Sequence, residues 1–264
     1  MPDLNIGVQV ASLRMPFKKA LPKIAEMGAS GVELDARYMF NPREMSDTAM
    51  RQIRKWLDDF NLKVCAVSFR TRRGYDVADD LQSRIEATKS AMRFAYAMGT
   101  NVVINQVGQV PSEEEMEPEE GRWSTLVQAL TDLGNYGQRV GAWLTMETGT
   151  ESGEDLARLI QALPEGSISV NLDPGNLIIN GFSPDEAVQQ LGHQIAHVHA
   201  KDGVRDLAQG RGLEVPLGRG TADFPNLLAR LEEHNYRGYF TIERENASDP
   251  LHEISLAAQF LSNI

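Results

Sequence analysis

Residues 142–175 read AWLTMETGTESGEDLARLIQALPEGSISVNLDPG, and this stretch holds one complete unit of the expected fold. An apolar run at 142–147 predicts a β-strand, and the amphipathic segment at 153–163 predicts a helix. A second apolar run at 168–172 predicts the next strand. Two strands joined through a helix are typical of a parallel pair. The unit therefore predicts a parallel sheet with helices packed on it.

The same rhythm of strand and helix extends along the rest of the chain. Gly28 and Gly99 end two of the predicted helices, and Ser46 begins another. The predicted strands lie at 4–10, 31–34, 62–67, 101–105, 142–147, 168–172, 195–199 and 238–242. The predicted helices lie at 17–27, 46–60, 79–98, 122–139, 153–163, 184–191, 224–234 and 250–261, with a loop at 202–220. Eight strand–helix pairs in 264 residues favour a closed barrel. We expect an α/β fold with one (β/α)8 TIM-barrel domain over residues 1–264.

Composition restricts the partners of the protein. Hydrophobic residues make up 42% and charged residues 24%, as in an ordinary globular protein. The net charge of −11 disfavours nucleic acid as a partner, because phosphate backbones need clustered Lys and Arg. We find no signal peptide and no apolar run of membrane-spanning length, so we expect a cytoplasmic protein with no membrane partner. The single cysteine, Cys65, is expected as a buried apolar residue. The acidic run at 113–120 is expected as solvated surface.

Four consecutive predicted strands end on an acid or an imidazole. The residues are Glu147, Asp173, His199 and Glu243. Side chains alternate between the two faces of a strand, and one phase of this alternation turns all four into the barrel. Neighbouring strands lie about 4.8 Å apart, so the four side chains can converge on one point. That point lies at the C-terminal ends of the strands, where TIM barrels carry their active sites.

Three carboxylates and one imidazole form an oxygen-rich site. Each residue alone is more typical of a loop cap, a salt bridge or a hydrogen-bonded core position. Burying three carboxylates together without a cation would be costly, however, so the set predicts one divalent metal ion. Such ligands favour Mn²⁺ first, or Mg²⁺, with Co²⁺ or Zn²⁺ as other occupants.

The motifs at these strand ends resemble those of a known superfamily. They are Met146-Glu147-Thr148-Gly149, Leu172-Asp173-Pro174-Gly175-Asn176, His197-Val198-His199-Ala200-Lys201-Asp202 and Ile242-Glu243-Arg244-Glu245. With them the chain resembles the sugar phosphate isomerase/epimerase superfamily, the xylose-isomerase-like TIM barrels. The resemblance implies that the four residues bind the metal and that Glu147 and Glu243 act as the acid–base pair. In the ketose 3-epimerase branch it also implies substrate binding by Arg205. That branch has a substrate-contacting histidine where this chain has Asn176.

The chemistry implied is proton transfer beside a carbonyl. A metal that binds the carbonyl and an adjacent hydroxyl oxygen stabilises the enediolate left by the proton. Return of the proton gives an epimer or an isomer, so we expect an isomerase or epimerase of a keto sugar. Loss of a β-hydroxyl group would instead give a lyase or dehydratase of an oxidised sugar, such as a 3-keto glycoside or an inosose. A non-catalytic sugar-binding barrel is a further alternative. An endonuclease-IV-like repair enzyme is disfavoured by the five histidines and the net charge.

Other polar residues are expected near the mouth of the barrel. Glu33 and Lys201 are candidates for substrate binding, and Glu33 could instead orient a metal ligand. His197 is expected one layer deeper, as a hydrogen-bond partner of the ligands. Residues Arg70, Arg72 and Arg73 either grip an anionic group or are solvated loop charges. The glycines of 218–220 either face a phosphate or form a tight turn, and we favour the turn. We expect a small carbohydrate as the ligand, and a homo-oligomer.

Overall fold

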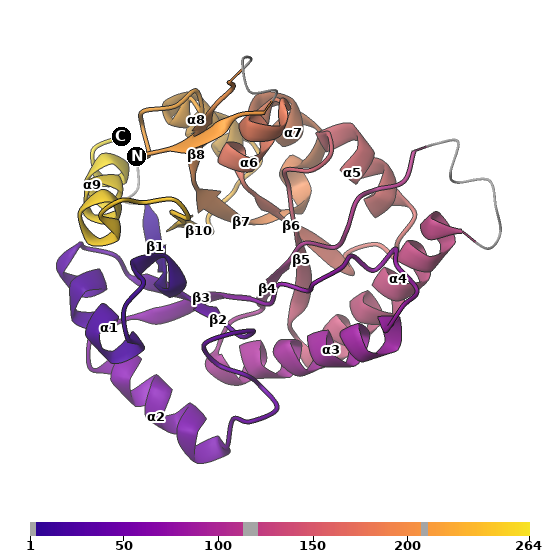
Figure 1. Cartoon of the computed structure of the whole chain (residues 1–264), viewed down its shortest axis with the longest axis horizontal. Coiled ribbons are helices and arrows are strands. Elements are labelled where there is room, and N and C mark those ends of the chain that lie inside the picture. Colours follow the sequence, from indigo (N-terminus) through magenta and orange to yellow (C-terminus); the bar gives the residue numbers. More distant parts are fainter. Residues whose placement is uncertain (1–3, 113–120, 207–210) are drawn as a thin grey trace.

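The computed structural model describes residues 4–112, 121–206 and 211–264, so the acidic run at 113–120 lies outside the described residues. Eight parallel strands close a barrel in the order β1-β10-β7-β6-β5-β4-β3-β2 (Figure 1). These strands are β1 (Asn5–Gln9), β2 (Gly31–Asp35), β3 (Lys63–Ser68), β4 (Val102–Asn105), β5 (Trp143–Glu147), β6 (Ile168–Leu172), β7 (Ile195–Ala200) and β10 (Tyr239–Ile242). The predicted TIM barrel is confirmed.

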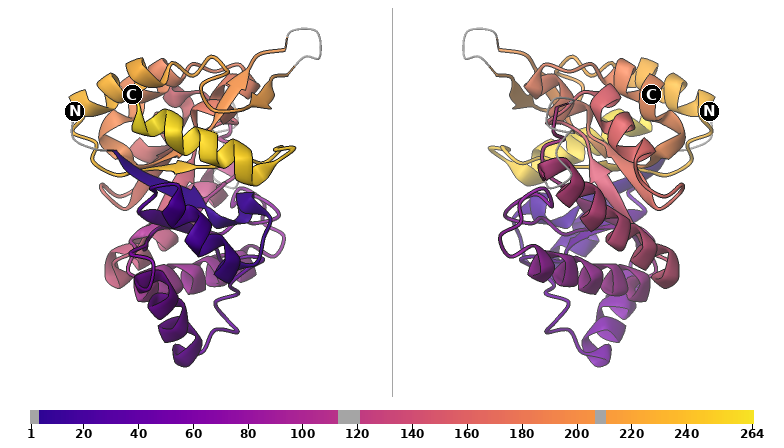
Figure 2. Two further views of the ribbon diagram at one scale, coloured as in Figure 1. Left: turned by 90° about the vertical axis from the view of Figure 1, so that its left-hand side faces the viewer. Right: turned by 90° about the vertical axis from the view of Figure 1, so that its right-hand side faces the viewer.

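Helices surround the barrel, as Figures 1 and 2 show. They are α1 (Phe17–Glu26), α2 (Asp47–Asp58), α3 (Leu81–Met98), α4 (Arg122–Val140), α5 (Gly153–Gln161), α7 (Pro184–Leu191), α8 (Phe224–Glu233) and α9 (Pro250–Ser262), with 3-10 turns η1 (Val10–Leu13) and η3 (Gly192–Gln194). Ser46 accepts the backbone N–H of Ala49 and so begins α2 as predicted. Gly99 ends α3 at φ 88°, a conformation that favours glycine.

One helix and one two-stranded hairpin were not predicted. The helix α6 (Pro174–Asn180) follows β6 directly, because Asp173 caps it and proline occupies its first turn. The expectation of a plain loop at 202–220 is wrong in part, since β8 (Asp202–Val204) and β9 (Leu213–Val215) form an antiparallel hairpin that projects from the barrel (Figure 2). Strands of three residues are too short to show an alternating pattern.

The barrel separates apolar from polar side chains by the alternation along each strand. Met146, Leu172, Val198 and Ile242 are buried in the main hydrophobic cluster. The residues that follow each of them in sequence therefore turn to the inside of the barrel. Cys65 is buried as predicted, with its sulfur 3.3 Å from Oγ1 of Thr241. Among the described residues, no helix combines the length and the apolar character that a membrane crossing requires.

Candidate active site

The four predicted ligands meet at the C-terminal end of the barrel. Glu147 ends β5, Asp173 follows β6, His199 lies near the end of β7 and Glu243 follows β10. One ligand atom from each residue lies within 4.8 Å of the ligand atoms of the other three. All four side chains are buried. Side chains of four neighbouring strands thus meet at one point, as the alternation along the strands predicts, and together they could hold a metal ion.

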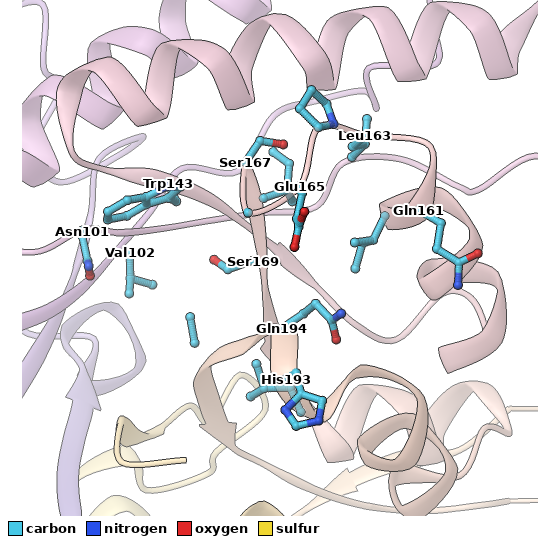
Figure 3. A pocket seen from close by; sticks show the side chains of 16 residues that line it. Asn101, Val102, Trp143, Gln161, Leu163, Glu165, Ser167, Ser169, His193 and Gln194 are labelled. Carbon is cyan, nitrogen blue, oxygen red and sulfur yellow. The ribbon is translucent and has the colours of Figure 1, made fainter. Parts of the chain in front are cut away.

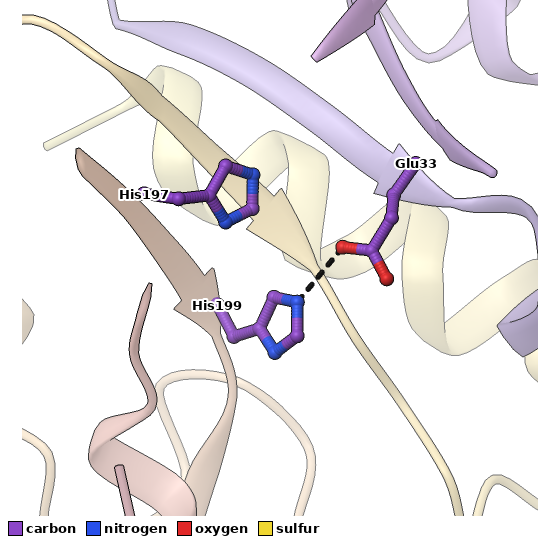
Figure 4. A group of neighbouring side chains, drawn as sticks. All are labelled: Glu33, His197 and His199. Atoms are coloured by element: carbon purple, nitrogen blue, oxygen red, sulfur yellow. Dashed lines mark hydrogen bonds and ion pairs between the residues drawn. The ribbon is translucent and has the colours of Figure 1, made fainter. Parts of the chain in front are cut away.

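The imidazole of His199 faces the carboxylates with one ring nitrogen. Its Nδ1 lies 3.1 Å from Oε1 of Glu147 and 3.3 Å from Oε2 of Glu243. The same atom lies 3.7 Å from Oδ2 of Asp173. Its Nε2 lies 2.8 Å from Oε2 of Glu33 (Figure 4). Glu33 therefore holds the ring with Nδ1 toward the other ligands, which is the arrangement that metal-binding histidines commonly show.

Asp173 leaves one oxygen free for a cation. Its Oδ1 accepts the backbone N–H of Asn176 at 2.8 Å and so caps α6. Its Oδ2 is buried and has no hydrogen-bond partner among the described residues. A buried carboxylate oxygen without a partner is costly, and a bound cation would remove that cost. Burial raises the pKa of Asp173 to about 6, although the charge of Lys201 opposes the shift. The residues present therefore fit a divalent metal.

Glu243 is held by several donors. Its Oε1 accepts from Arg70 at 2.6 Å and from Gln9 at 2.7 Å, and Nζ of Lys201 lies 3.2 Å from its Oε2. Burial by itself would raise the pKa of Glu243, but the charges of His199 and Lys201 bring it well below its usual value. Glu243 is therefore ionised and fixed in position.

The charges of the carboxylates also act on the imidazole. Burial would lower the pKa of His199, but the charges of Glu243 and Glu33 raise it well above its usual value. In the protein without a metal, His199 is therefore an imidazolium cation, with a proton on each ring nitrogen. A metal ion needs the neutral imidazole, so it would have to displace one of these protons.

A chain of polar contacts leads from His199 into the barrel interior. The Nδ2 of Asn171 lies 3.1 Å from its Nδ1, and Oδ1 of Asn171 lies 2.9 Å from Nδ1 of His197. The Nε2 of His197 lies 2.9 Å from Oγ1 of Thr241. Burial and the charge of His199 lower the pKa of His197 to about 3, so His197 is neutral. Its ring lies beside that of His199, with the two ring centroids 5.5 Å apart (Figure 4). Its role as a supporting partner of the ligands stays a prediction.

Two residues of this network were missed from the sequence. Gln9, at the end of β1, donates to Glu33 at 2.9 Å as well as to Glu243. Asn171 lies two residues before Asp173, on the same face of β6. Both are polar residues inside buried strands, and that pattern could have revealed them.

The residues expected to bind substrate occupy different places. Lys201 is buried beside Glu243, and Glu33 is buried against His199. Asn176 lines a cavity together with Glu147. Arg205 is exposed, and its guanidinium lies near Gly181 at the end of α6. The substrate-binding roles of these residues stay predictions.

The loop before α8 uses its backbone N–H groups internally. Oδ2 of Asp202 accepts the N–H of Gly218 at 3.0 Å and that of Gly220 at 2.8 Å. Oδ1 of Asp202 accepts the N–H of Ala222 at 3.0 Å. Asp202 therefore anchors the turn. These N–H groups do not face a phosphate, which agrees with the preference for a tight turn.

Cavities open at both ends of the barrel. One of about 710 Å³ lies at the N-terminal ends of β4 to β7, where Figure 3 shows Trp143, Ser169 and His193 on its wall. None of the four ligands lines it. A cavity of about 630 Å³ at the other end includes Glu147 in its wall. Because chemistry in TIM barrels takes place at the C-terminal ends of the strands, the cavity at Glu147 is the one that leads to the active site.

Residues 21–264 match the model of the xylose isomerase-like TIM barrel family. The chain belongs to this family. Among its curated relatives is the inosose dehydratase of Clostridium botulinum (strain Alaska E43 / Type E3), 26% identical over 263 residues, which cover 87% of this chain and 82% of the relative. The relationship places the chain among enzymes that modify sugars, and leaves dehydratase and isomerase or epimerase both open within the family.

Solved structures of this family share the fold. The xylose isomerase domain protein from Planctomyces limnophilus has a TM-score of 0.85 at 24% identity, over 99% of this chain and 96% of that chain. The 3-keto-D-glucoside 4-epimerase from E. coli has a TM-score of 0.76 at 18% identity, over 99% of this chain and 100% of that chain. At these identities the likeness shows the xylose isomerase-like barrel alone.

Proposed function

We propose that the protein is a divalent-metal-dependent isomerase or epimerase of a keto sugar or sugar derivative. The observation that carries the proposal is the convergence of Glu147, Asp173, His199 and Glu243. Oδ2 of Asp173 has no hydrogen-bond partner among the described residues, and the nearest positive groups, on His199 and Lys201, lie 3.7 and 3.8 Å from it. A non-catalytic sugar-binding barrel would not need two buried glutamates at one point. The reaction proposed is transfer of a proton at the carbon beside the carbonyl.

The donor set supports a hard cation. Three of the four ligand atoms are carboxylate oxygens, which suit Mn²⁺ or Mg²⁺, and Mn²⁺ is the ion that we propose. When bound, such an ion supplies electrostatic stabilisation of the negative charge that develops on the substrate oxygens. The protein contributes the position of the ligands, and Glu33 supports His199 through its contact with Nε2, which leaves Nδ1 facing the carboxylates.

Glu147 and Glu243 are the residues that we propose for the proton transfer. Both are carboxylates beside the same point, and they come from strands on either side of β6 and β7. Glu147 lines the cavity at the C-terminal end, so a substrate there reaches it directly. Glu243, which is ionised, would remove the proton from the carbon beside the carbonyl and so become a carboxylic acid. For epimerisation Glu147 must enter the step protonated, and it would then give that proton to the opposite face of the same carbon. The substrate oxygens meet the ammonium group of Lys201, which is buried beside Glu243.

A dehydratase is the second candidate, and the inosose dehydratase among the curated relatives favours it. The first step would be the same removal of a proton by a carboxylate. A hydroxyl group on the next carbon would then leave, and we propose that Lys201, whose Nζ lies 3.2 Å from Glu243, protonates it. The two candidates differ only in whether water is lost.

Deuterium incorporation tests both candidates. The Mn²⁺-loaded protein would be incubated in D₂O with ketoses, 3-keto glycosides and an inosose, and followed by NMR. Exchange beside the carbonyl without loss of water supports the isomerase or epimerase. Appearance of an unsaturated ketone with release of water supports the dehydratase. Absence of exchange with every compound, despite one metal bound per chain, would contradict the proposal.

Matched variants make the result specific. Glu147→Gln and Glu243→Gln keep the size of each side chain and remove its charge, so each should lower the exchange rate by about a hundredfold or more. Glu165→Gln is the control, because Glu165 is exposed and lines the cavity at the opposite end of the barrel. Equal exchange rates in all three variants would show that neither Glu147 nor Glu243 takes part in the proton transfer.

A further inference from the structure

The cavity at Glu147 has a wall that carries positive charge. Its volume is about 630 Å³, within the range of small-molecule sites. Loops after β3, β4, β5 and β6 and the hairpin of β8 and β9 line it. Three arginines belong to the wall, namely Arg72, Arg73 and Arg211, whereas Glu147 is the one carboxylate among the lining residues that the structure describes. The described part of the wall thus carries more positive than negative side chains, whereas the whole chain has a net charge of −11.

Two of the three arginines have no acidic partner. Arg73 donates to Oδ2 of Asp79 at 3.0 Å. Among the described residues, neither Arg72 nor Arg211 has an ion pair or a hydrogen bond from its guanidinium, and both are exposed. The hydroxyl of Thr71, in the same wall, is buried and also lacks a partner among the described residues. The wall therefore presents unused donors to whatever fills the cavity.

The loop that carries Arg72 is fixed in place. The backbone N–H of Tyr75 donates to the carbonyl oxygen of Val107 at 2.7 Å. A Cβ atom on Gly74 would lie 2.3 Å from Cα of Gly108, so the two loops touch through their glycines. Such contacts hold the loops after β3 and β4 together before any ligand arrives, which lowers the entropy cost of binding.

Other positive groups near the site are already engaged. Arg70 contacts Glu243 at 2.6 Å and Glu245 at 2.9 Å, and Lys201 lies between the same two carboxylates. The N–H groups of the turn at 218–220 bind Asp202. Arg72 and Arg211 are thus the arginines of the cavity wall that face no carboxylate among the described residues.

From this wall we infer that the substrate carries an anionic group, a carboxylate or a phosphate, which Arg72 and Arg211 bind while its carbonyl end lies at Glu147. The inference rests on the proposed function and names the substrate class: a keto sugar acid or a keto sugar phosphate. A guanidinium binds either anion through two parallel hydrogen bonds, so the same arginines suit both. The positive wall also attracts an anion toward an otherwise acidic protein.

Matched ligands test the inference directly. Binding to the Mn²⁺-loaded protein would be measured by calorimetry for D-fructose, D-fructose 6-phosphate and 5-keto-D-gluconate. At least one of the two anions should bind about tenfold more tightly than fructose. Its affinity should fall as NaCl is raised from about 0.01 to 0.15 M, because salt screens exposed charges. The preferred anion distinguishes a phosphate from a carboxylate. Equal binding of all three ligands, or no binding of either anion, overturns the inference.

Variants locate the effect. Arg72→Gln and Arg211→Gln should each weaken binding of the preferred anion about tenfold and leave fructose binding unchanged. Arg51→Gln is the control, since Arg51 is exposed on α2, away from the cavity lining. Both substitutions are at exposed positions, and an unchanged melting temperature would show that the variants fold. Anion binding that is unaffected in the double variant overturns the inference.

Deuterium exchange on the same complexes separates this inference from the proposed function. Exchange beside the carbonyl without preference for the anionic ligands would leave the proposed function standing and remove the anion site. Binding of an anion that depends on the arginines, without exchange of any ligand, would support the anion site and contradict the proposed function.

Discussion

The Nε2 atom of His199 lies 2.8 Å from Oε2 of Glu33, and this contact turns the opposite ring nitrogen toward the three ligand carboxylates. The two residues are 166 positions apart in the chain. Glu33 itself is held by the amide of Gln9 at 2.9 Å. The orientation of this imidazole thus depends on β1 and β2, two strands that supply none of the four predicted ligands.

Replacing Glu33 should therefore weaken the metal site. Glu33→Gln keeps the shape of the side chain but removes the charge that fixes His199, and partners of this kind are worth roughly 10- to 100-fold in metal affinity. Titration of the metal-free protein with Mn²⁺ would measure the loss. Glu26→Gln, at an exposed position of α1, should bind as the unaltered protein does. Equal affinities in the two variants would show that Glu33 does not act through His199.

Metal affinity should rise with pH. The metal needs a neutral His199 and an ionised Asp173, while the metal-free protein raises the pKa of His199 well above its usual value and that of Asp173 to about 6. At a pH below either raised pKa, the metal can bind only by expelling the proton from that group. This requirement lowers the metal affinity as the pH falls. Affinity should therefore change about tenfold per pH unit just above pH 6, where only His199 must lose a proton, and more steeply below it.

Calorimetry in buffers of different ionisation enthalpy would count the protons released. A proton count near one at pH 7 that rises below pH 6 is expected. Affinity that is independent of pH between about 5 and 8 would contradict the shifted pKa values of His199 and Asp173.

Asp173→Asn should separate metal binding from folding. Asparagine keeps the oxygen that caps α6 and removes a buried charge whose raised pKa costs stability above pH 6. The metal-free variant should be as stable as the unaltered protein, or more stable by up to about 3 kcal/mol, at pH 7.5. It should also lose most of its affinity for Mn²⁺. Urea unfolding with and without metal would measure both effects.

Asp223→Asn is the matched control for that variant. Asp223 caps α8 in the same way but is exposed. Its replacement should change neither stability nor metal affinity by more than a few tenths of a kcal/mol. A large loss of metal-free stability in Asp173→Asn alone would mean that its charge stabilises the fold, contrary to the expectation.

Gly149→Ala should destabilise the protein. Gly149 has φ 143°, and a Cβ atom there would lie 2.5 Å from Cβ of Asn176. Backbone strain and the clash together should cost roughly 2–4 kcal/mol in the free energy of unfolding, measured with urea. Gly166→Ala provides the comparison, because Gly166 has φ 66° but no atom within 4 Å of such a Cβ, so about 1 kcal/mol is expected. Equal losses would show that the contact with Asn176 is unimportant.

The barrel and the convergence of the four predicted ligands could both be derived from local sequence patterns. The eight apolar runs and the helices between them follow from periodicity, which is a local property of the chain. Glu147 and its three partners could be placed together because alternation along a strand has a period of two, so the position at which a strand ends fixes the side to which its last residue points.

The contacts that hold these four side chains, and the residues that line the cavity beside them, could be identified only in the folded barrel. Gln9 and Glu243 touch although 234 positions separate them, and no local pattern encodes that contact. Arg70 and Arg72 lie two residues apart in one loop, yet Arg70 pairs with Glu243 and Arg72 faces the cavity. Similar sequence signals have different outcomes here because hydrogen bonds and ion pairs depend on distances that only closure of the barrel brings within reach.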